Sequence, residues 1–304
     1  MKLTVLDVGG TEIKYSVMEE NLIPCGSGTV RTPLESRDAF YRCVEEIYQR
    51  IGAGTEGVAM ALPGIIDSDR GYCYTGGMLA FHQGHAVASE LSERLGCPVH
   101  IENDGKCAAL AEYTCGSLRG CRNAAVFLIG TGVGGGLIVN GQLLKGSHFS
   151  AGEFSFLMKE PQTPENIESF VGYSCSVRAF LALVRRESLI SESEPLDGRM
   201  AFARIQAGDP GANRALRQFG RRVACEVLNL QTLLDAERVA IGGGISRQPL
   251  LIDSIRSGFA EILGQAPYLN GILQPTVEIV PCRFYNEANQ IGAWQSYAAW
   301  HADS

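Results

Sequence analysis

Apolar and polar positions in the first part of the chain switch between the two-residue period of strands and the 3.6-residue period of helices. The segment LTVLDVGGTEIKYSVMEE reads as an apolar strand, a Gly-Gly turn and a half-buried return strand, which predicts a hairpin. A third short strand is expected in GSGTVRTP, and RDAFYRCVEEIYQRI carries Phe40, Val44, Ile47 and Ile51 at helical spacing. Strands in GVAMALPGIID and PVHIEND then alternate with helices in GHAVASELSERLG and GKCAALAEYTCG, as in a mixed sheet covered by helices.

The same plan begins again at Asn123, where NAAVFLIGTGVGGGLIVNGQLL reads as an apolar strand, a Gly-rich turn and a second strand. NIESFVGYSCSVRAFLALVRRE is predicted to be mainly helical, and SESEPLDG to be an exposed acidic loop. A long helix in GANRALRQFGRRVACEVLNLQTLLD has one apolar stripe, made of Leu216, Phe219, Val223, Val227 and Leu230. Strands in RVAIGGGI and VEIVP precede a closing helix in NEANQIGAWQSYAAW. The repetition predicts two lobes, 1–120 and 121–286, which hold a ligand between them, with helix 287–304 returning to the first lobe.

Composition excludes several classes of partner. The chain has 304 residues, is 45% hydrophobic and carries a formal net charge of -7, so it can bury a large core but offers no basic surface. Nucleic acid and anionic membranes are therefore not expected to bind it. No apolar run approaches the roughly 20 residues that span a bilayer, and the N-terminus shows no secretion-signal pattern. We expect a cytoplasmic protein with a small-molecule partner.

Cysteine and histidine spacing does not indicate a metal centre. No two of the 10 cysteines show the C-x-x-C spacing of zinc or redox sites, so most are expected to be small buried thiols in a reducing compartment. His82 and His85 share an H-x-x-H spacing, but no cysteine or carboxylate lies near them in the sequence, and a metal site is not expected there.

Three glycine-rich turns each follow a predicted strand: DVGGT (Asp7 to Thr11), IGTGVGGG (Ile129 to Gly136) and IGGGI (Ile241 to Ile245). A tight turn alone explains any one of them. Three together favour phosphate binding, because glycine lets several backbone N–H groups approach one ligand. None has the Walker A or the dinucleotide spacing, and the first two lead into strands rather than helices. A nucleotide held by hairpins is typical of the actin-like ATPase fold.

DVGGTEIK, IENDGKCAALAE, LIGTGVGGGLIVNGQLLKG, SAGEFSF and VAIGGGI, in this order, resemble the ROK family (repressors, open reading frames, kinases) over nearly the whole chain. The resemblance implies an α/β actin-like ATPase (ribonuclease H-like) fold, with a mixed sheet flanked by helices in each lobe. It implies a sugar kinase that transfers the γ-phosphoryl group of ATP, with Mg²⁺, to the 6-hydroxyl of glucose, N-acetylmannosamine or a β-glucoside. It further implies a homodimer, with sugar and phosphate bound by the first lobe and with nucleotide binding and dimerisation in the second.

The same resemblance assigns roles to individual residues. The first phosphate motif contains Asp7, Gly9, Gly10, Thr11 and Lys14, and Asp7 meets magnesium through water or phosphate. The second phosphate motif contains Gly130, Thr131 and Gly132, and the adenosine motif contains Gly242, Gly243 and Gly244. Sugar binding is assigned to Asn103, Glu153, Pro63, Gly64 and Gly77, and the role of catalytic base to Asp104.

The chemistry of Asp104 agrees with the role that the resemblance implies. Phosphoryl transfer needs cradled phosphates, a placed magnesium ion and a carboxylate that accepts the proton of the attacking hydroxyl. A short Asp at the end of a strand can be held rigidly within hydrogen-bond reach of that hydroxyl. The alternative is that Asp104 only caps the following helix, which would contribute about 1 kcal/mol. Glu102 points opposite to Asn103 by strand alternation and is expected to anchor the strand end.

The chain departs from the family pattern at several positions. Phe156 stands where many members have a zinc-binding histidine, and only one cysteine follows, so zinc is not expected. Phe156 either admits a bulkier group at the anomeric end of the sugar or packs within the protein. Lys106 stands where an Asn is common; it is expected to be solvated, with contact to phosphate as the alternative. Glu168 is the candidate for a further family glutamate.

Two other functions remain open. A sugar-sensing regulator of the same family carries an N-terminal DNA-binding extension, whereas Lys2 and Leu3 enter the first strand at once and the chain is acidic. A catalytically silent sugar or nucleotide binder is disfavoured, because Asp7, Asp104 and all three glycine turns are present.

Overall fold

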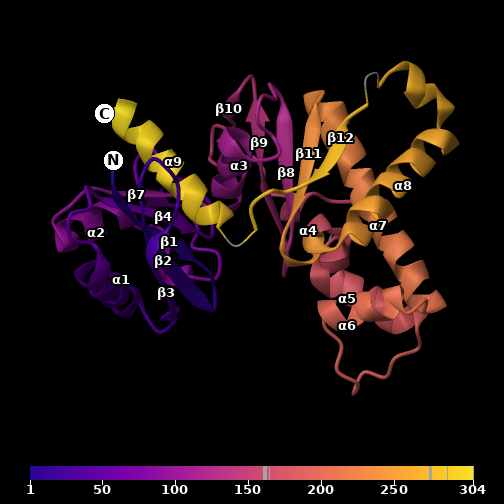
Figure 1. Ribbon diagram of the computed structural model, residues 1–304, viewed down its shortest axis with the longest axis horizontal. Coiled ribbons are helices and arrows are strands. Elements are labelled where there is room, and N and C mark those ends of the chain that lie inside the picture. The colour runs from indigo at the N-terminus through magenta and orange to yellow at the C-terminus, as the bar shows by residue number, and fades with distance from the viewer. Residues whose placement is uncertain (160–162, 164, 274–275, 286, 304) are drawn as a thin grey trace. The chain divides into compact units, whose positions relative to one another are not determined.

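Contacts divide the chain into two compact units, each with its own sheet (Figure 1). The computed structural model describes residues 1–159, 163, 165–273, 276–285 and 287–303. Unit 1 comprises Met1–Ala111, Lys145–Ala151 and Asn286–Ser304, and unit 2 comprises Glu112–Leu144 and Gly152–Tyr285. The lobe boundary near residue 120 and the functions assigned to the lobes stay predictions.

The sheet of unit 1 has five strands in the order β3-β2-β1-β4-β7. They are β1 (Leu3–Val8), β2 (Glu12–Met18), β3 (Cys25–Arg31), β4 (Val58–Leu62) and β7 (Val99–Asn103). The first three form antiparallel pairs, which confirms the predicted hairpin and third strand. β1, β4 and β7 run parallel as neighbours, so their carboxyl ends meet at one edge of the sheet. A two-stranded ribbon of β5 (Ile66–Asp67) and β6 (Tyr72–Cys73) follows β4.

Helices cover this sheet because their apolar stripes face it. α1 (Arg37–Ile51) begins at Ser36, whose hydroxyl caps the first turn, and its predicted stripe buries Phe40, Val44 and Ile47. The other elements of this unit are α2 (Val87–Leu95), the short η1 (Ala80–His82), the first turns of α3 (Asp104–Cys115) and α9 (Ala288–Asp303). α9 packs against β1, β4 and β7 (Figure 1). Gln290 Nε2 of α9 donates a hydrogen bond to Val5 O.

The sheet of unit 2 repeats the arrangement with the order β10-β9-β8-β11-β12. Its strands are β8 (Ala124–Ile129), β9 (Val133–Val139), β10 (Gln142–Leu143), β11 (Arg238–Gly242) and β12 (Glu278–Pro281). β8 and β9 form the predicted second hairpin, and β8, β11 and β12 run parallel. The carboxyl ends of β8 and β11 therefore lie side by side, which places two of the glycine turns next to each other.

Longer helices complete unit 2. They are α4 (Val171–Ser174), α5 (Val177–Glu187), α6 (Gly198–Gln206), α7 (Pro210–Leu234) and α8 (Pro249–Gln265), with short turns η2 (Phe154–Phe156), η3 (Ile167–Ser169), η4 (Gly244–Arg247) and η5 (Pro267–Gly271). The predicted apolar stripe of α7 is buried at all five positions. α6 and α8 were not predicted from the sequence.

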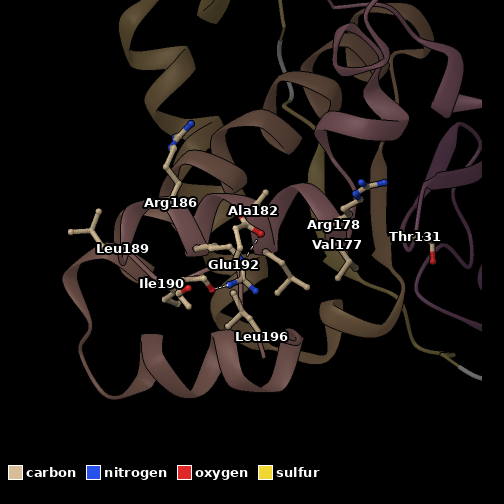
Figure 2. A pocket seen from close by; sticks show the side chains of 12 residues that line it. Thr131, Val177, Arg178, Ala182, Arg186, Leu189, Ile190, Glu192 and Leu196 are labelled. Carbon is tan, nitrogen blue, oxygen red and sulfur yellow. Dashed lines mark hydrogen bonds and ion pairs between the residues drawn. The ribbon is translucent and has the colours of Figure 1, made fainter. Parts of the chain in front are cut away.

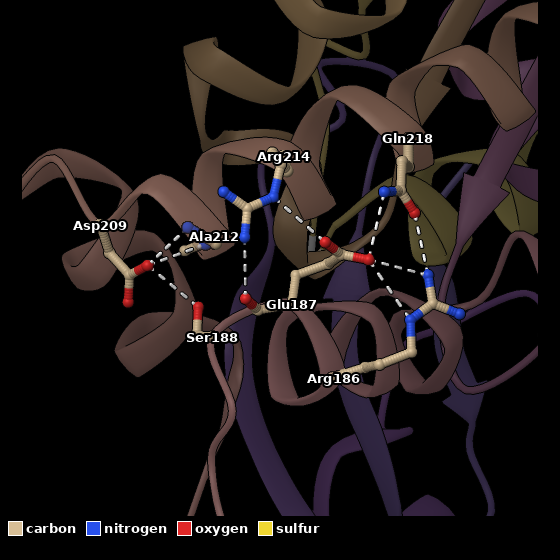
Figure 3. Close-up of polar contacts among 8 residues, drawn as sticks. Arg186, Glu187, Ser188, Asp209, Ala212, Arg214 and Gln218 are labelled. Carbon is tan, nitrogen blue, oxygen red and sulfur yellow. Dashed lines mark hydrogen bonds and ion pairs between the residues drawn. The ribbon is translucent and has the colours of Figure 1, made fainter.

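Polar contacts hold the end of α5 against the start of α7 (Figure 3). The Glu187 carboxylate accepts hydrogen bonds from Arg186, Arg214 and Gln218. Asp209 caps α7 by accepting from Ala212 N at 3.1 Å, and it also accepts from the Ser188 hydroxyl at 3.1 Å. These contacts fix the far end of α5, which lines the large cavity described below.

The cysteines are all free thiols, and five of them are buried: Cys73, Cys107, Cys121, Cys175 and Cys282. Within the described ranges, no cluster of three or more His, Cys, Asp or Glu side chains could hold a metal ion. Of the helices that the structure describes, none has the length and apolar character that crossing a membrane requires.

Candidate active site

The first glycine turn joins β1 to β2 and lies at the edge where the parallel strands of unit 1 end. Gly9 N donates to Glu12 O at 3.0 Å, and the Thr32 hydroxyl donates to Gly9 O at 2.7 Å. A Cβ built on Gly10 would lie 2.5 Å from the Sδ atom of Met78, so the loop after Gly77 touches this turn. The turn is thus held from both sides.

Asp7 is the carboxylate of this turn. It lies opposite Lys14 in the β1–β2 register, with 3.7 Å between Lys14 Nζ and Asp7 Oδ2, and Asn289 Nδ2 donates to its Oδ1 at 2.9 Å. Burial raises the pKa of Asp7, while the Asn289 hydrogen bond and the Lys14 charge act in the opposite direction. Sequence reasoning missed Asn289, whose only signal is an Asn at the start of the closing helix.

Asn103 and Asp104 stand where β7 ends and α3 begins. Asn103 Oδ1 accepts from Lys106 N at 3.0 Å, which makes Asn103 the helix cap. Asn103 Nδ2 donates to Gly64 O at 3.0 Å and lies 3.2 Å from Asp104 Oδ1. Asp104 Oδ1 also accepts from Gly105 N at 2.8 Å. The capping role considered for Asp104 thus belongs to Asn103, and Asp104 is held in place by its neighbours.

The sugar loop predicted around Pro63 and Gly64 follows β4 at the same edge. A Cβ on Gly64 would lie 2.3 Å from Thr75 O, and the φ of Gly64 is +109°, so only glycine fits there. Gly77 packs on Pro63, with 3.1 Å between a Cβ built on Gly77 and the Cβ of Pro63. The structure therefore brings Gly64 and Gly77 together beside Asn103.

The expectation for Lys106 is wrong. Its side chain is buried, with 1% of its surface exposed, and Nζ donates to Phe149 O at 2.9 Å. The partner carbonyl lies in the segment Lys145–Ala151, which packs in unit 1 although it follows β10 in the sequence. Nearby, Glu102 is fully buried; its Oε1 accepts from Asn103 N at 2.8 Å, and burial raises the pKa of its carboxyl.

In unit 2 the second and third glycine turns lie in contact. A Cβ on Gly243 would lie 2.1 Å from Ile129 O, and Gly243 has a φ of +92°, so the two turns pack backbone on backbone. Gly130 O accepts from Val177 N at 2.9 Å, which ties the second turn to the start of α5. The structure thus gathers Gly130, Thr131, Gly132, Gly242, Gly243 and Gly244 at one edge of the unit 2 sheet.

A cavity of 920 Å³ opens beside these turns. Thr131 lies at one end, Val177 and Arg178 come next along α5, and Leu189 lies at the other end (Figure 2). Its floor combines apolar side chains such as Leu196 with charged ones such as Arg185 and Glu192. A cavity of this size and character suits a drug-sized ligand with an apolar ring and polar substituents.

Glu153 immediately precedes η2, and its carbonyl accepts from Phe156 N at 3.1 Å. Phe156 is 70% exposed, so its ring is not packed within the protein. Ser155 binds both the N–H and the carbonyl of Val133, which fixes this turn next to the second glycine turn. Glu168 is exposed in η3, after Asn166. Glu153 thus belongs to unit 2, whereas the other predicted sugar residues, Pro63, Gly64, Gly77 and Asn103, belong to unit 1.

Comparison with known proteins agrees with this arrangement. The sequence model of the ROK family matches residues 3–298 of this chain. A beta-glucoside kinase of Klebsiella pneumoniae is 31% identical over 279 residues, covering 90% of this chain and 91% of that protein. The structure of a ROK hexokinase from Thermus thermophilus is 27% identical with a TM-score of 0.80, and 100% of each chain is covered. A ROK family protein from Streptococcus pneumoniae, solved in complex with sucrose, is 25% identical with a TM-score of 0.85 and full coverage of both chains. These likenesses confirm the predicted actin-like ATPase fold.

Proposed function

Because the chain belongs to the ROK family, we propose that it is an ATP-dependent sugar kinase that phosphorylates the 6-hydroxyl of a hexose or hexose derivative. One observation carries the proposal. Asp7, Gly64 and the Asn103–Asp104 pair stand at the carboxyl ends of three neighbouring parallel strands, the edge at which α/β sheets bind ligands. A phosphate turn and a held carboxylate at one edge are what phosphoryl transfer to a hydroxyl requires.

Asp104 is the proposed base. Its Oδ1 is held by Gly105 N and Asn103 Nδ2, so the carboxylate is oriented before substrate arrives. It accepts the proton of the sugar hydroxyl as the oxygen of that hydroxyl attacks the γ-phosphorus of ATP. At the same time the bond breaks between the γ-phosphorus and the oxygen that bridges it to the β-phosphate. Asn103 positions both the base and the Gly64 loop, whose backbone we propose to bind the sugar.

Asp7 is the proposed partner of magnesium, directly or through water. A single carboxylate suits that ion, because Mg²⁺ at nucleotide sites keeps several waters and binds one or two carboxylates and the phosphates. When bound, the ion neutralises charge on the phosphates. Asn289 and Lys14 help to keep Asp7 ionised against its burial.

The adenosine of ATP is proposed to occupy the 920 Å³ cavity of unit 2. Thr131 lines that cavity and belongs to the second phosphate motif, so one ligand can reach both. Ile245, the last residue of the third glycine turn, contacts Gly198 at the start of α6, two residues beyond Leu196 of the cavity wall.

The test is an ADP-release assay with Mg-ATP on glucose, mannose, N-acetylmannosamine, N-acetylglucosamine, cellobiose and gentiobiose, run on the wild type and Asp104→Asn. We expect turnover on at least one sugar. In Asp104→Asn the turnover rate should fall by about 10³-fold or more, because the variant loses both the general base and its part in positioning the substrate. Asp253→Asn, an exposed carboxylate on α8, is the matched control.

Sugar binding without turnover on any sugar would contradict the proposal and favour a sensor or silent binder, with calorimetry reporting the binding. Product analysis by NMR identifies the phosphorylated hydroxyl. The expected homodimer is a separate prediction, which light scattering tests.

A further inference from the structure

A pocket of unit 1 lies at the opposite end of β7 from Asn103. Its volume is 280 Å³, and it is lined by the turn between β5 and β6, by α2, by the start of β7 and by the end of α9. Val99 and His100 are the residues of β7 that reach it. None of the residues that line it belongs to the candidate active site, so the pocket needs an explanation of its own.

His100 is a buried polar side chain of this pocket, with 3% of its surface exposed. Its ring stacks on Trp300, with centroids 5.2 Å apart and 25° between the planes, and its Nε2 lies 2.8 Å from Ser296 Oγ. In the part of the chain that the structure describes, this is the one hydrogen bond of the ring, so Nδ1 has no partner. A buried ring nitrogen without a hydrogen bond is unfavourable, and Nδ1 is therefore available to a molecule in the pocket.

Charge in the pocket is balanced. Burial lowers the pKa of His100 to about 3, so its ring is neutral at neutral pH. Asp69 Oδ1 accepts from Lys145 Nζ at 2.6 Å, and Arg70 Nη1 lies 4.0 Å from Asp67 Oδ2. Among the described residues that line the pocket, no charge is thus left unpaired. A neutral ligand suits it better than an ion, which would lose hydration without gaining a counter-charge.

The remaining polar atoms of the pocket suit hydroxyl groups. Ser89 Oγ donates to Ala86 O at 3.0 Å and Ser92 Oγ donates to Cys97 O at 2.7 Å, so both oxygens can still accept. Nδ1 of the neutral His100 ring donates or accepts, depending on which nitrogen holds the proton. A hydroxyl group meets each of these needs, because it is a donor and an acceptor at once.

The volume of the pocket limits the ligand to a single small ring. Ligand pockets begin at roughly 300 Å³, and this pocket has 280 Å³. Pro98, Val99 and the indole of Trp300 give it apolar surface, on which the C–H face of a pyranose can pack. One ring with several hydroxyl groups and an apolar face describes a monosaccharide.

We propose that this pocket binds a neutral monosaccharide, in addition to the sugar proposed for the candidate active site. His100 and Asn103 are three residues apart on β7, which is about 10 Å along a strand. The two sugars are then bound near the two ends of one strand. This inference goes beyond the proposed kinase function and does not depend on it.

The experiment follows binding through the fluorescence of Trp300. The chain has two tryptophans, and the other, Trp294, is buried with a ring N–H that has no partner among the described residues. Trp294→Phe therefore leaves Trp300 as the single tryptophan. Glucose, mannose, galactose and N-acetylglucosamine are titrated into this protein. Cellobiose serves as the probe with two rings, and glucose 6-phosphate as the anionic probe.

We expect a saturable change in fluorescence with at least one of the four monosaccharides, with half-saturation in the millimolar range that suits so small a ligand. Cellobiose and glucose 6-phosphate should bind at least about tenfold more weakly, because the one is too large and the other carries charge.

Variants in the Trp294→Phe protein locate the sugar. Ser89→Phe, on the exposed side of α2, fills the pocket with a ring and should abolish the change. Glu93→Phe on the same helix is the matched control, because Glu93 is exposed and does not line the pocket. His100→Phe keeps a ring against Trp300 but removes Nδ1, and affinity should fall about five- to tenfold, the effect of one hydrogen bond. Ser296→Ala removes only the partner of Nε2 and should keep the affinity.

The outcomes test the pocket separately from the kinase function. Loss of the change in Ser89→Phe but not in Glu93→Phe supports the inference. A change that persists in Ser89→Phe, or no saturable change with any monosaccharide, would overturn it. A response to cellobiose or glucose 6-phosphate as strong as that to the monosaccharides would also overturn it. Equal losses in His100→Phe and Ser296→Ala would refute the role of Nδ1. The ADP-release assay decides the kinase function in every case.

Discussion

The ammonium group of Lys106 donates a hydrogen bond to the carbonyl oxygen of Phe149 at 2.9 Å, and this bond joins the first turn of α3 to the segment Lys145–Ala151. Both partners of this bond have a feature that is energetically unfavourable by itself. A buried ammonium needs an acceptor, and Phe149 has a φ of +59°, a conformation that side chains other than glycine rarely adopt. The bond therefore compensates for two unfavourable features at the edge of the candidate site.

Lys106→Met should weaken sugar binding more than ATP binding. The change removes the donor, so Phe149 and the segment around it lose their fixed position beside Asn103. We expect the KM for the best sugar to rise about tenfold, the effect of one lost charged hydrogen bond. Steady-state kinetics with each substrate varied in turn measures it. Lys2→Met, at a lysine whose side chain is 41% exposed, is the control, and equal increases in both KM values would contradict the prediction.

Asn289→Leu should move the acid limb of the pH profile of kcat/KM for ATP to higher pH. The Asn289 amide stabilises the ionised form of Asp7, whose pKa burial already raises. Without this donor the pKa of Asp7 rises further, so Asp7 is protonated at a higher pH and activity is lost earlier on acidification. Asn229→Leu removes a comparable amide from Glu226 on α7 and should leave the limb in place. An unchanged limb in Asn289→Leu would refute the assignment of Asp7.

His82→Phe should make the protein less sensitive to acid. His82 lies among Phe40, Tyr41 and Phe81, neither ring nitrogen has a partner among the described residues, and burial lowers its pKa to about 4. Below the ordinary pKa of 6.5 the unfolded chain takes up a proton that the folded chain refuses, so stability falls between pH 6.5 and 4.

At pH 5 that loss amounts to about 2 kcal/mol, which the Phe variant should avoid. Urea denaturation at pH 7.5 and pH 5, followed by fluorescence, measures the difference. His148→Phe, at an exposed histidine, should keep the full loss. The same loss in His82→Phe would show that His82 does not carry it.

Gly292→Ala should destabilise the protein, because α9 and α3 touch backbone to backbone at this point. A Cβ on Gly292 would lie 1.8 Å from Cys107 O, and a helix cannot move one residue without moving its neighbours. We expect a loss of about 2 kcal/mol or more. Gly264→Ala in α8 has open space around it and should be neutral or stabilising. Thermal melting of the two variants provides the comparison, and similar melting temperatures would contradict it.

The hairpins and the parallel strands could be predicted because each depends on a local pattern. Alternation and a Gly-Gly turn identify β1 and β2, and the change from apolar to polar at the end of PVHI identifies the position of Asn103 and Asp104. Lys106 was wrongly expected to be solvated because the argument considered only its own helix. Its acceptor is 43 residues away in the sequence, in a segment that no periodic pattern marks.

The contact of Asn289 could not be predicted for the same reason, because its partner is even more distant in the sequence. It binds Asp7 across 282 residues, and nothing near either residue in the sequence signals the pairing. The aromatic pair of Tyr74 and Phe149 is likewise made of residues from different loops, each unremarkable alone. Local periodicity reports which face of an element is buried, whereas the partner that covers it depends on the fold as a whole.

Unit 1 is built from three separate stretches of chain, and this affects the order in which the protein can fold during synthesis. β1 is synthesised before unit 2, whereas α9, which packs on β1, β4 and β7, is synthesised only after the whole of unit 2. Until then one face of the first sheet lacks its covering helix, and Asp7 lacks Asn289. While unit 2 is being synthesised, unit 1 therefore exposes apolar surface that α9 covers later, and surface of that kind is prone to aggregation before folding is complete.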